Sequence, residues 1–231
     1  MSRKPPERDI HVLHAVGRFR MLTRPQLKRW FFSGVSEPVV SRFIDRLAGR
    51  GLLGVERLHG NGFQVLWLTR RGREFLVHHG VPEVDLFTAM GPVAAKDFEH
   101  TVEIGNVAVW LAKRVPPPDE LLPAWAFQRL FSGRTRVIPD LIALWRLAGD
   151  RAGAALVIEV DLGTEGLSKV FLPKLQQLST MSVDLLGVDA RVLALVRSAS
   201  RRNTLRQLAA EASLDVAVEG FEVLTPSDKL S

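Results

Sequence analysis

The sequence contains no cysteine, which excludes disulfide bonds, cysteine nucleophiles and zinc sites built on thiolates. It also lacks any apolar stretch near the roughly 20 residues of a membrane-spanning helix, and its start, MSRKPPERD, contains no apolar signal-peptide core. We therefore expect a cytoplasmic protein without membrane contact. With 231 residues, of which 46% are hydrophobic and 24% charged, the chain is long enough for two folded domains.

Other chemical signatures are missing as well. Gly163 and Gly166 are too isolated to form a loop that holds a nucleotide phosphate, so we expect no nucleotide cofactor. The adjacent His78 and His79 point to different faces of a helix, which makes a metal site there improbable. No arrangement of serine, histidine and acid typical of a hydrolase is recognisable.

The distribution of charge is uneven along the chain. Residues 1–80 contain 15 Lys and Arg against 6 Asp and Glu, whereas residues 81–231 contain 16 against 19. A basic face beside a neutral or acidic remainder is typical of nucleic-acid-binding proteins, because phosphate contacts release counterions and supply most of the non-specific affinity. A basic surface that serves only solubility would give the same count, so charge alone leaves both interpretations open.

The pattern of residues 8–80 predicts three helices, a hairpin and a fourth helix. Apolar residues at helical spacing run from Arg8 to Gly17, Thr23 and Pro25 begin a second helix, and Ser36 caps a third that ends at Gly49 or Gly51. The strand-like runs LLGVERL and FQVLWLT are joined by an Asn-Gly turn, a strong hairpin signal. The segment TRRGREFLVHHG predicts the fourth helix, a connector or a dimer contact.

This order resembles the winged helix-turn-helix, with SEPVVSRFIDRLAGRGLL in the place of the recognition helix. The resemblance implies that the third helix enters the major groove of DNA and that the hairpin contacts the backbone. Arg42 is the best candidate for reading a base, because a guanidinium can hold guanine by two hydrogen bonds. The complete set of predicted DNA-binding residues is Arg24, Lys28, Arg29, Ser36, Ser41, Arg42, Arg46, Arg50, Arg57, His59 and Asn61.

Two further expectations follow from this resemblance. One recognition helix reads few base pairs, so we expect a homodimer that binds paired half-sites on double-stranded DNA. DNA binding of this kind requires no cofactor. Many winged helices serve instead as protein-interaction modules, and that alternative stays open.

A linker is predicted over residues 81–96 and a second domain over residues 97–231, after the winged helix of residues 1–80. A helix over 98–114 ends before three prolines, and the segments after it predict three strands, a helix, a strand, a helix and a strand. The strands are predicted at PAWAFQRLF, RVIPDLIALWR, AALVIEVD, ARVLALVRS and DVAVEGFEVL. Continuous apolar runs indicate a sheet covered on both faces, hence an α/β domain in a chain that is α+β as a whole. Pro173 indicates that the helix after the third strand is kinked or begins late.

The run LVIEVDLGTEG places Glu159 and Asp161 on one face of an apolar strand, because side chains alternate along a strand. Asp140 lies 19 residues before Glu159, which suits two adjacent strands joined by a turn. Burying unpaired carboxylates is costly. Oxygen ligands from two strands are what a hard divalent cation requires, so a metal is one way to hold these acids together.

These elements and motifs resemble the PD-(D/E)XK fold of restriction-endonuclease-like nucleases, which has a central mixed sheet. The resemblance implies that Asp140, Glu159 and Asp161 would bind Mg or Mn, with Glu103 as a further ligand. A lysine normally stands where this chain has Asp161, so Lys169 or Lys174 would have to supply the cation. The domain is therefore either a lapsed nuclease kept for assembly or an active Mg-dependent deoxyribonuclease.

The whole arrangement resembles the replication-relaxation family of bacterial plasmid, phage and integrative-element proteins. The match rests on a winged helix, a helix that begins near His100, the IPD strand at Asp140 and the EVD-x-GTE segment from Glu159 to Glu165; the chain departs from the family at Leu162 and in having no tyrosine. The resemblance implies a double-stranded DNA-binding regulator of replication, transfer or transcription of a mobile element. The alternatives are a metal-dependent endonuclease or nickase and a protein-binding adaptor.

Overall fold

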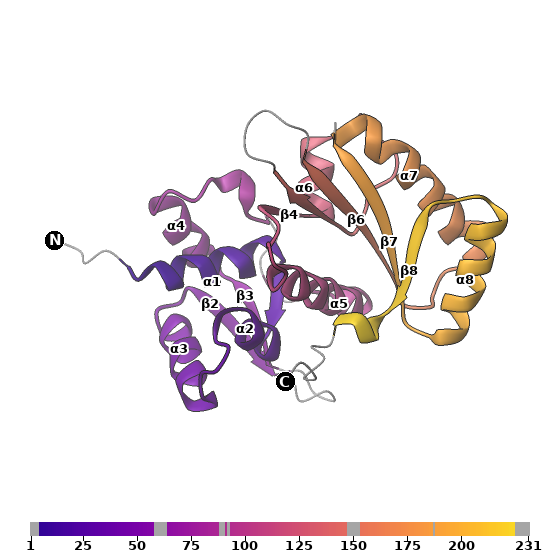
Figure 1. Cartoon of the computed structure of the whole chain (residues 1–231). Coiled ribbons are helices and arrows are strands. Elements are labelled where there is room, and N and C mark those ends of the chain that lie inside the picture. The colour runs from indigo at the N-terminus through magenta and orange to yellow at the C-terminus, as the bar shows by residue number, and fades with distance from the viewer. Residues whose placement is uncertain are drawn as a thin grey trace. The chain divides into compact units, whose positions relative to one another are not determined.

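The computed structural model describes residues 5–57, 64–87, 91, 93–146, 153–186 and 188–224 (Figure 1). The chain divides into two compact units, Met1–Val109 (the first unit) and Trp110–Ser231 (the second unit). Within the described part of the chain, no helix has both the length and the apolar character needed to cross a membrane.

The first unit consists of helices around a three-stranded antiparallel sheet with the order β1-β3-β2. Its elements are α1 (Glu7–Arg18), β1 (Met21–Thr23), α2 (Arg24–Phe31), α3 (Glu37–Gly49), β2 (Leu53–Arg57), β3 (Gln64–Leu68), α4 (Arg70–His78), a 3-10 turn (Glu83–Asp85) and α5 (Ala95–Ala112), whose last residues belong to the second unit. The predicted helices and hairpin strands of residues 8–80 are present. The tip of the hairpin lies outside the described residues.

The ends of these helices follow from local chemistry. Thr23 and Gln26 form a capping box at the start of α2, in which each side chain accepts a hydrogen bond from the backbone N–H of the other. Gly51 after α3 has a positive φ of 69°, the left-handed conformation that glycine adopts at helix ends. The apolar stripe of α3, with Val40, Ile44 and Leu47, is buried. This stripe fixes which face of α3 is left to solvent.

The second unit contains a five-stranded mixed sheet in the order β4-β5-β6-β7-β8. Strands β4, β5 and β6 pair antiparallel, whereas β6, β7 and β8 pair parallel. The elements are β4 (Glu120–Pro123), α6 (Ala124–Leu130), β5 (Leu141–Trp145), β6 (Ala154–Asp161), a π-helical turn (Leu167–Phe171), α7 (Leu172–Leu186), β7 (Asp189–Val196), α8 (Ala199–Glu211), β8 (Val216–Gly220) and a 3-10 turn (Phe221–Leu224). The predicted fold class, with a central mixed sheet, is confirmed.

Helices α6, α7 and α8 pack on one face of this sheet (Figure 1). Phe127, Leu175 and Leu205 from the three helices share a core with Val157 and Ala194 of the central strands. The alternate strand residues, such as Ile158 and Leu195, are buried as well. Burial on both faces explains the continuous apolar runs in the sequence.

One predicted strand is wrong. The run PAWAFQRLF forms only the last residue of β4 and then the helix α6, because a short apolar run has no periodicity that distinguishes a buried strand from a buried helix. The strand that pairs with β5 lies just before it, at Glu120–Pro123. For the helix after β6, Pro173 indicates either a kink or a late start. The late start is confirmed, since a π-helical turn precedes α7 and Pro173 is the second residue of α7.

Candidate functional site

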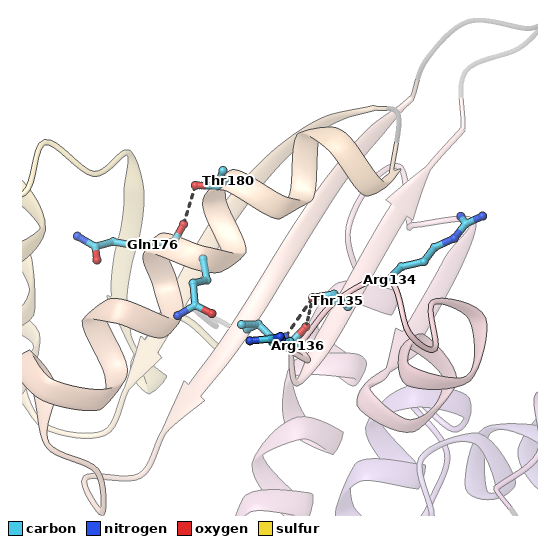
Figure 2. Close-up of a pocket in the computed structure, with 7 residues that line it drawn as sticks. Arg134, Thr135, Arg136, Gln176 and Thr180 are labelled. Carbon is cyan, nitrogen blue, oxygen red and sulfur yellow. Dashed lines mark hydrogen bonds between the residues drawn. The ribbon is translucent and has the colours of Figure 1, made fainter.

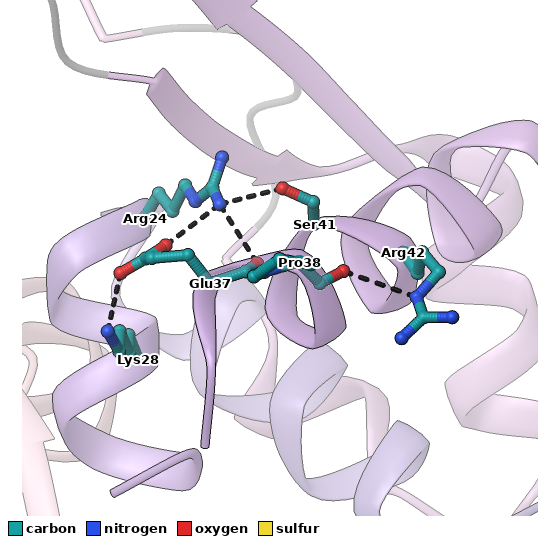
Figure 3. A network of polar contacts seen from close by, with 6 residues as sticks. All are labelled: Arg24, Lys28, Glu37, Pro38, Ser41 and Arg42. Atoms are coloured by element: carbon teal, nitrogen blue, oxygen red, sulfur yellow. Dashed lines mark hydrogen bonds and ion pairs between the residues drawn. The ribbon is translucent and has the colours of Figure 1, made fainter. Parts of the chain in front are cut away.

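The exposed face of α3 presents a polar surface that begins directly after the turn from α2. Glu37, Pro38, Arg42 and Asp45 are exposed on this face, opposite the buried stripe. The side chain of Arg42 contacts the described chain through Nε, which donates to the carbonyl of Pro38 at 3.4 Å. Figure 3 shows the terminal nitrogens of Arg42 directed away from its helix. In this position the two terminal nitrogens of the Arg42 guanidinium can donate to an acceptor outside the chain.

A cluster at the start of α3, which we call the Glu37 clamp, joins α2 to α3 (Figure 3). Arg24 donates to the Glu37 carboxylate at 2.8 Å and to Ser41 Oγ at 2.7 Å, and Lys28 Nζ lies 2.5 Å from the other carboxylate oxygen of Glu37. The hydrogen bond from Lys28 is the main reason that the pKa of Glu37 lies below its ordinary value. Two predicted DNA-binding residues, Arg24 and Lys28, are therefore engaged with one acid of α3, and a third, Ser41, accepts a hydrogen bond from Arg24.

Arg46 has a different environment from Arg42, one turn earlier on α3. Its guanidinium donates two hydrogen bonds of 2.7 Å to the two carboxylate oxygens of Asp9 on α1. Arg50 also approaches Asp9, at 3.7 Å, and the Asp9 side chain is 1% exposed. Such bidentate, charge-assisted pairs are geometrically specific. Arg46 therefore fastens α3 to α1.

Sequence reasoning missed Asp9, although a signal was present. Asp9 falls at helical spacing with Val12, Leu13 and Val16, so an acid stands within the buried stripe of α1. A buried carboxylate needs a cation as partner, and the basic residues of α3 are candidates for that partner.

The remaining predicted DNA-binding residues are placed as follows. Arg29 lies on α2, Ser36 is the exposed residue before α3, and Arg57 ends β2 as an exposed residue. His59 and Asn61 lie outside the described residues.

In the second unit, Asp140 and Glu159 are neighbours across two adjacent strands, as the spacing predicts. Asp140 directly precedes β5, and Glu159 lies on β6. The backbone N–H of Asp140 donates to Glu159 Oε1 at 3.0 Å, and Asp140 Oδ2 accepts from the N–H of Val160 at 2.8 Å. Both side chains are buried.

Lys174 on α7 completes this acidic pair, with Nζ 2.5 Å from Glu159 Oε2. Burial, and then the charge of Asp140, raise the pKa of Glu159 to about 8, although Lys174 acts in the opposite direction. Burial alone would lower the pKa of Lys174, but attraction to Glu159 and Asp140 outweighs it and raises that pKa. Within the Asp140–Glu159–Lys174 cluster, Glu159 and Lys174 therefore both bind a proton more tightly than usual.

Asp161 is paired with Arg201 on α8. Arg201 Nε donates to one carboxylate oxygen at 2.7 Å, and Arg201 NH2 donates to the other at 3.0 Å. The backbone N–H of Gly163 also donates to this carboxylate, and Arg201 reaches the carbonyl of Glu165. Sequence reasoning missed Arg201, and only the general need of a buried acid for a cation pointed to such a partner.

Two other predicted residues lie elsewhere. Lys169 is exposed on the π-helical turn before α7. Glu103 belongs to the first unit, on α5, where it accepts a hydrogen bond from Asn106 at 3.0 Å. Among the described residues, no group of three or more acidic, histidine or cysteine side chains is arranged to hold a metal ion.

In their observed arrangement, the buried acids Glu159 and Asp161 do not form a site for a divalent cation. Both carboxylate oxygens of Glu159 face donors, one from the Asp140 backbone and one from Lys174. Both oxygens of Asp161 face Arg201. Protein cations therefore hold the positions that a metal would need.

The comparison with known families matches the part of the chain that carries these features. The replication-relaxation family model covers residues 13–181, well over half of the chain, and this range contains α2, α3, the Asp140–Glu159–Lys174 cluster and Asp161. No curated protein matches the sequence. The chain belongs to the replication-relaxation family.

Proposed function

We propose that the protein is a double-stranded DNA-binding regulator of replication, transfer or transcription of a mobile element. The observation that carries this proposal is the exposed face of α3, which presents Arg42 directly after the short turn from α2. This face lies in the part of the chain where residues 1–80 carry 15 basic against 6 acidic side chains. In this proposal the first unit is a winged helix-turn-helix.

Each cation in the first unit would have its own role. Arg42 would read a guanine through its two-nitrogen edge. Arg29, Arg50 and Arg57 would contact phosphates, which position the protein without reading sequence. Arg24 and Lys28, held by Glu37, would approach the backbone at the start of α3.

The second unit would serve assembly rather than catalysis. Lys174 pairs with Glu159, and Arg201 pairs with Asp161, at distances of 2.5 to 3.0 Å. The acids then stabilise contacts between the sheet and helices α7 and α8. A domain of this kind can position a partner subunit without any cofactor.

Binding to duplexes selected from a random pool tests the proposal. Affinity measured by fluorescence anisotropy is expected to fall steeply as salt rises, because each neutralised phosphate contributes a slope of about −0.9 in log affinity against log salt. Arg42→Ala is expected to cost about 1 to 3 kcal/mol on the selected site. Arg191→Ala, at an exposed position of β7, is the control. A response that does not depend on salt would sink the proposal.

A second candidate, a metal-dependent endonuclease or nickase, is favoured by one observation. Lys174 reaches the Glu159 carboxylate from the neighbouring helix, and in this candidate function it would take the place of the lysine that the PD-(D/E)XK pattern has at position 161. Incubation of supercoiled plasmid with the protein and either Mg or Mn tests it. Cleavage that disappears in Glu159→Gln would replace the assembly role with catalysis, and intact plasmid would leave that role in place.

A further inference from the structure

The segment that leads from α6 to β5 is basic and exposed. Arg129, Arg134 and Arg136 are all exposed, and the sequence from Ala124 to Pro139 contains no acidic residue. We call residues 129–136 the basic segment. It lies in the part of the chain that is acidic as a whole, since residues 81–231 contain 16 basic against 19 acidic side chains.

The arginines of this segment differ from most others in the second unit. On α8, Arg201, Arg202 and Arg206 each pair with an acid. Within the described residues, by contrast, Arg129, Arg134 and Arg136 have no acidic partner. Within the part of the chain that the structure describes, no acid therefore neutralises their charge.

The basic segment forms one wall of a pocket of about 460 Å³, and α7 forms the other (Figure 2). The lining residues are Arg134, Thr135, Arg136, Val137, Gln176, Gln177 and Thr180. None of them is acidic, and two arginines and two glutamines provide hydrogen-bond donors. In Figure 2, Arg134 extends away from α7. The pocket is open to solvent and suits an anion that passes along it.

Local hydrogen bonds fix the shape of this pocket. Thr135 Oγ1 donates to the carbonyl of Val137 at 3.0 Å and accepts from the N–H of the same residue at 3.1 Å. On α7, Thr180 Oγ1 donates to the carbonyl of Gln176 at 3.1 Å. The backbone between the arginines is thus held by Thr135.

We propose that this pocket binds the phosphodiester backbone of DNA, which gives the second unit its own DNA contact; the inference rests on the proposed DNA-binding function. The arginines are exposed, so a single small anion would gain little there against water. An extended polyanion gains from several such contacts at once, because each releases counterions. Phosphate contacts of this kind add affinity and orientation without sequence preference.

The test compares two double variants of the full-length protein on the same duplex. Arg134→Gln with Arg136→Gln removes two charges at the pocket, and Arg114→Gln with Arg191→Gln removes two exposed charges elsewhere in the chain. The pocket variant is expected to bind several-fold more weakly at low salt, with a salt slope less steep by about 2. The control variant is expected to keep the parent slope. All four positions are exposed, and thermal unfolding of each variant verifies the fold.

The outcomes separate the two proposals. If the parent does not bind duplex at low salt, the proposed function fails. If the parent binds but the pocket variant keeps the parent slope, the pocket inference fails and the proposed function stands. Titration of the parent and of the pocket variant with inorganic phosphate is a further experiment. If phosphate binding depends on Arg134 and Arg136 while the salt slope of duplex binding does not change, the pocket binds the free anion and the inference is overturned.

Discussion

At the scale of single residues, two arginines one turn apart on α3 have separate tasks. Arg46 is bound through both terminal nitrogens to the buried Asp9, whereas the hydrogen bond of Arg42 within the described chain comes from Nε. The basic composition of this helix therefore does not translate directly into DNA contacts. A guanidinium that holds two helices together is less available to a phosphate.

Arg46→Ala is expected to lower the free energy of unfolding by about 2 kcal/mol, because it leaves Asp9 buried with only the more distant Arg50. We place the effect below that of a fully buried pair because the Arg46 side chain is partly exposed. Arg42→Ala, on the same helix, is expected to change the stability by less than about 0.5 kcal/mol. Urea unfolding of both variants measures this difference. If Arg46→Ala has the stability of the parent but binds DNA more weakly, Arg46 contacts DNA and does not fasten α3 to α1.

Glu37→Gln is expected to strengthen non-specific duplex binding several-fold and to steepen its salt slope. The substitution removes the charge that holds Arg24 and Lys28, and both then become available to phosphates. Asp45→Asn makes the same charge change on the same helix at an exposed position and serves as the control. Weaker binding of Glu37→Gln would show instead that Glu37 accepts a hydrogen bond from a base, as a carboxylate does from cytosine.

The raised pKa of Glu159 makes a prediction about pH. In the fold this pKa is about 8, whereas its ordinary value is 4.5, so the folded state binds the proton more tightly than the unfolded chain. The resulting stabilisation is complete below about pH 4.5 and is lost as the pH rises to 8. Glu159→Gln is therefore expected to gain stability relative to the parent between pH 5 and 8. Parallel stability curves for the two proteins, measured by urea unfolding, would contradict the raised pKa.

At the scale of elements, the side-chain amide of Gln26 joins α2 to α5. Gln26, whose side chain completes the capping box of α2, donates from Nε2 to the carbonyl of Val102 at 2.6 Å and to Asn106 at 3.0 Å. Gly105 of α5 faces this amide so closely that a Cβ there would lie 2.8 Å from Gln26 Nε2. A side chain at position 105 would therefore have to displace the Gln26 amide from these partners.

Gly105→Ala is expected to destabilise the protein, even though alanine is the better helix former by about 1 kcal/mol. The added methyl group displaces Gln26 from Val102 and Asn106, and it leaves polar groups without their partners. Gly49→Ala is the matched control, because a Cβ there meets nothing within 4 Å, and a gain of up to about 1 kcal/mol is expected. The urea midpoints of the two variants should move in opposite directions. A gain in both would remove the packing role of Gly105.

Sequence reasoning succeeded where the signal is local. Thr23 and Pro25 mark the start of α2 through their own chemistry, and the 19-residue spacing, which fits two adjacent strands, correctly places Glu159 beside Asp140. It failed where the partner is distant in the chain. The pairs of Asp9 with Arg46 and of Asp161 with Arg201 join residues 37 and 40 positions apart, and no periodicity encodes them. The three-residue strand β1 was missed because its pairing with β3 is likewise long-range.

At the scale of the whole molecule, the chain combines a unit of helices around a three-stranded sheet and a unit built on a five-stranded mixed sheet, in a member of the replication-relaxation family. The two proposed DNA contacts divide the work between the units. The first unit would supply sequence reading through Arg42, and the second would add phosphate contacts at the basic segment. One recognition helix covers few base pairs, which limits the specificity of a single chain.

The last prediction concerns assembly. If two chains bind together, sites selected from a random duplex pool are expected to contain two copies of a short half-site, with centres separated by about 10 base pairs or a multiple, because this spacing returns the major groove to the same side of the helix. Sedimentation of the protein with such a site should give two chains for each duplex. The affinity of Arg42→Ala should be measured on intact sites and on sites with one damaged half-site. The factor by which the variant loses affinity, counted for each intact half-site, should be similar for the two kinds of site. Selected sites with a single half-site and one bound chain would contradict a homodimer and would leave the pocket of the second unit as the source of additional affinity.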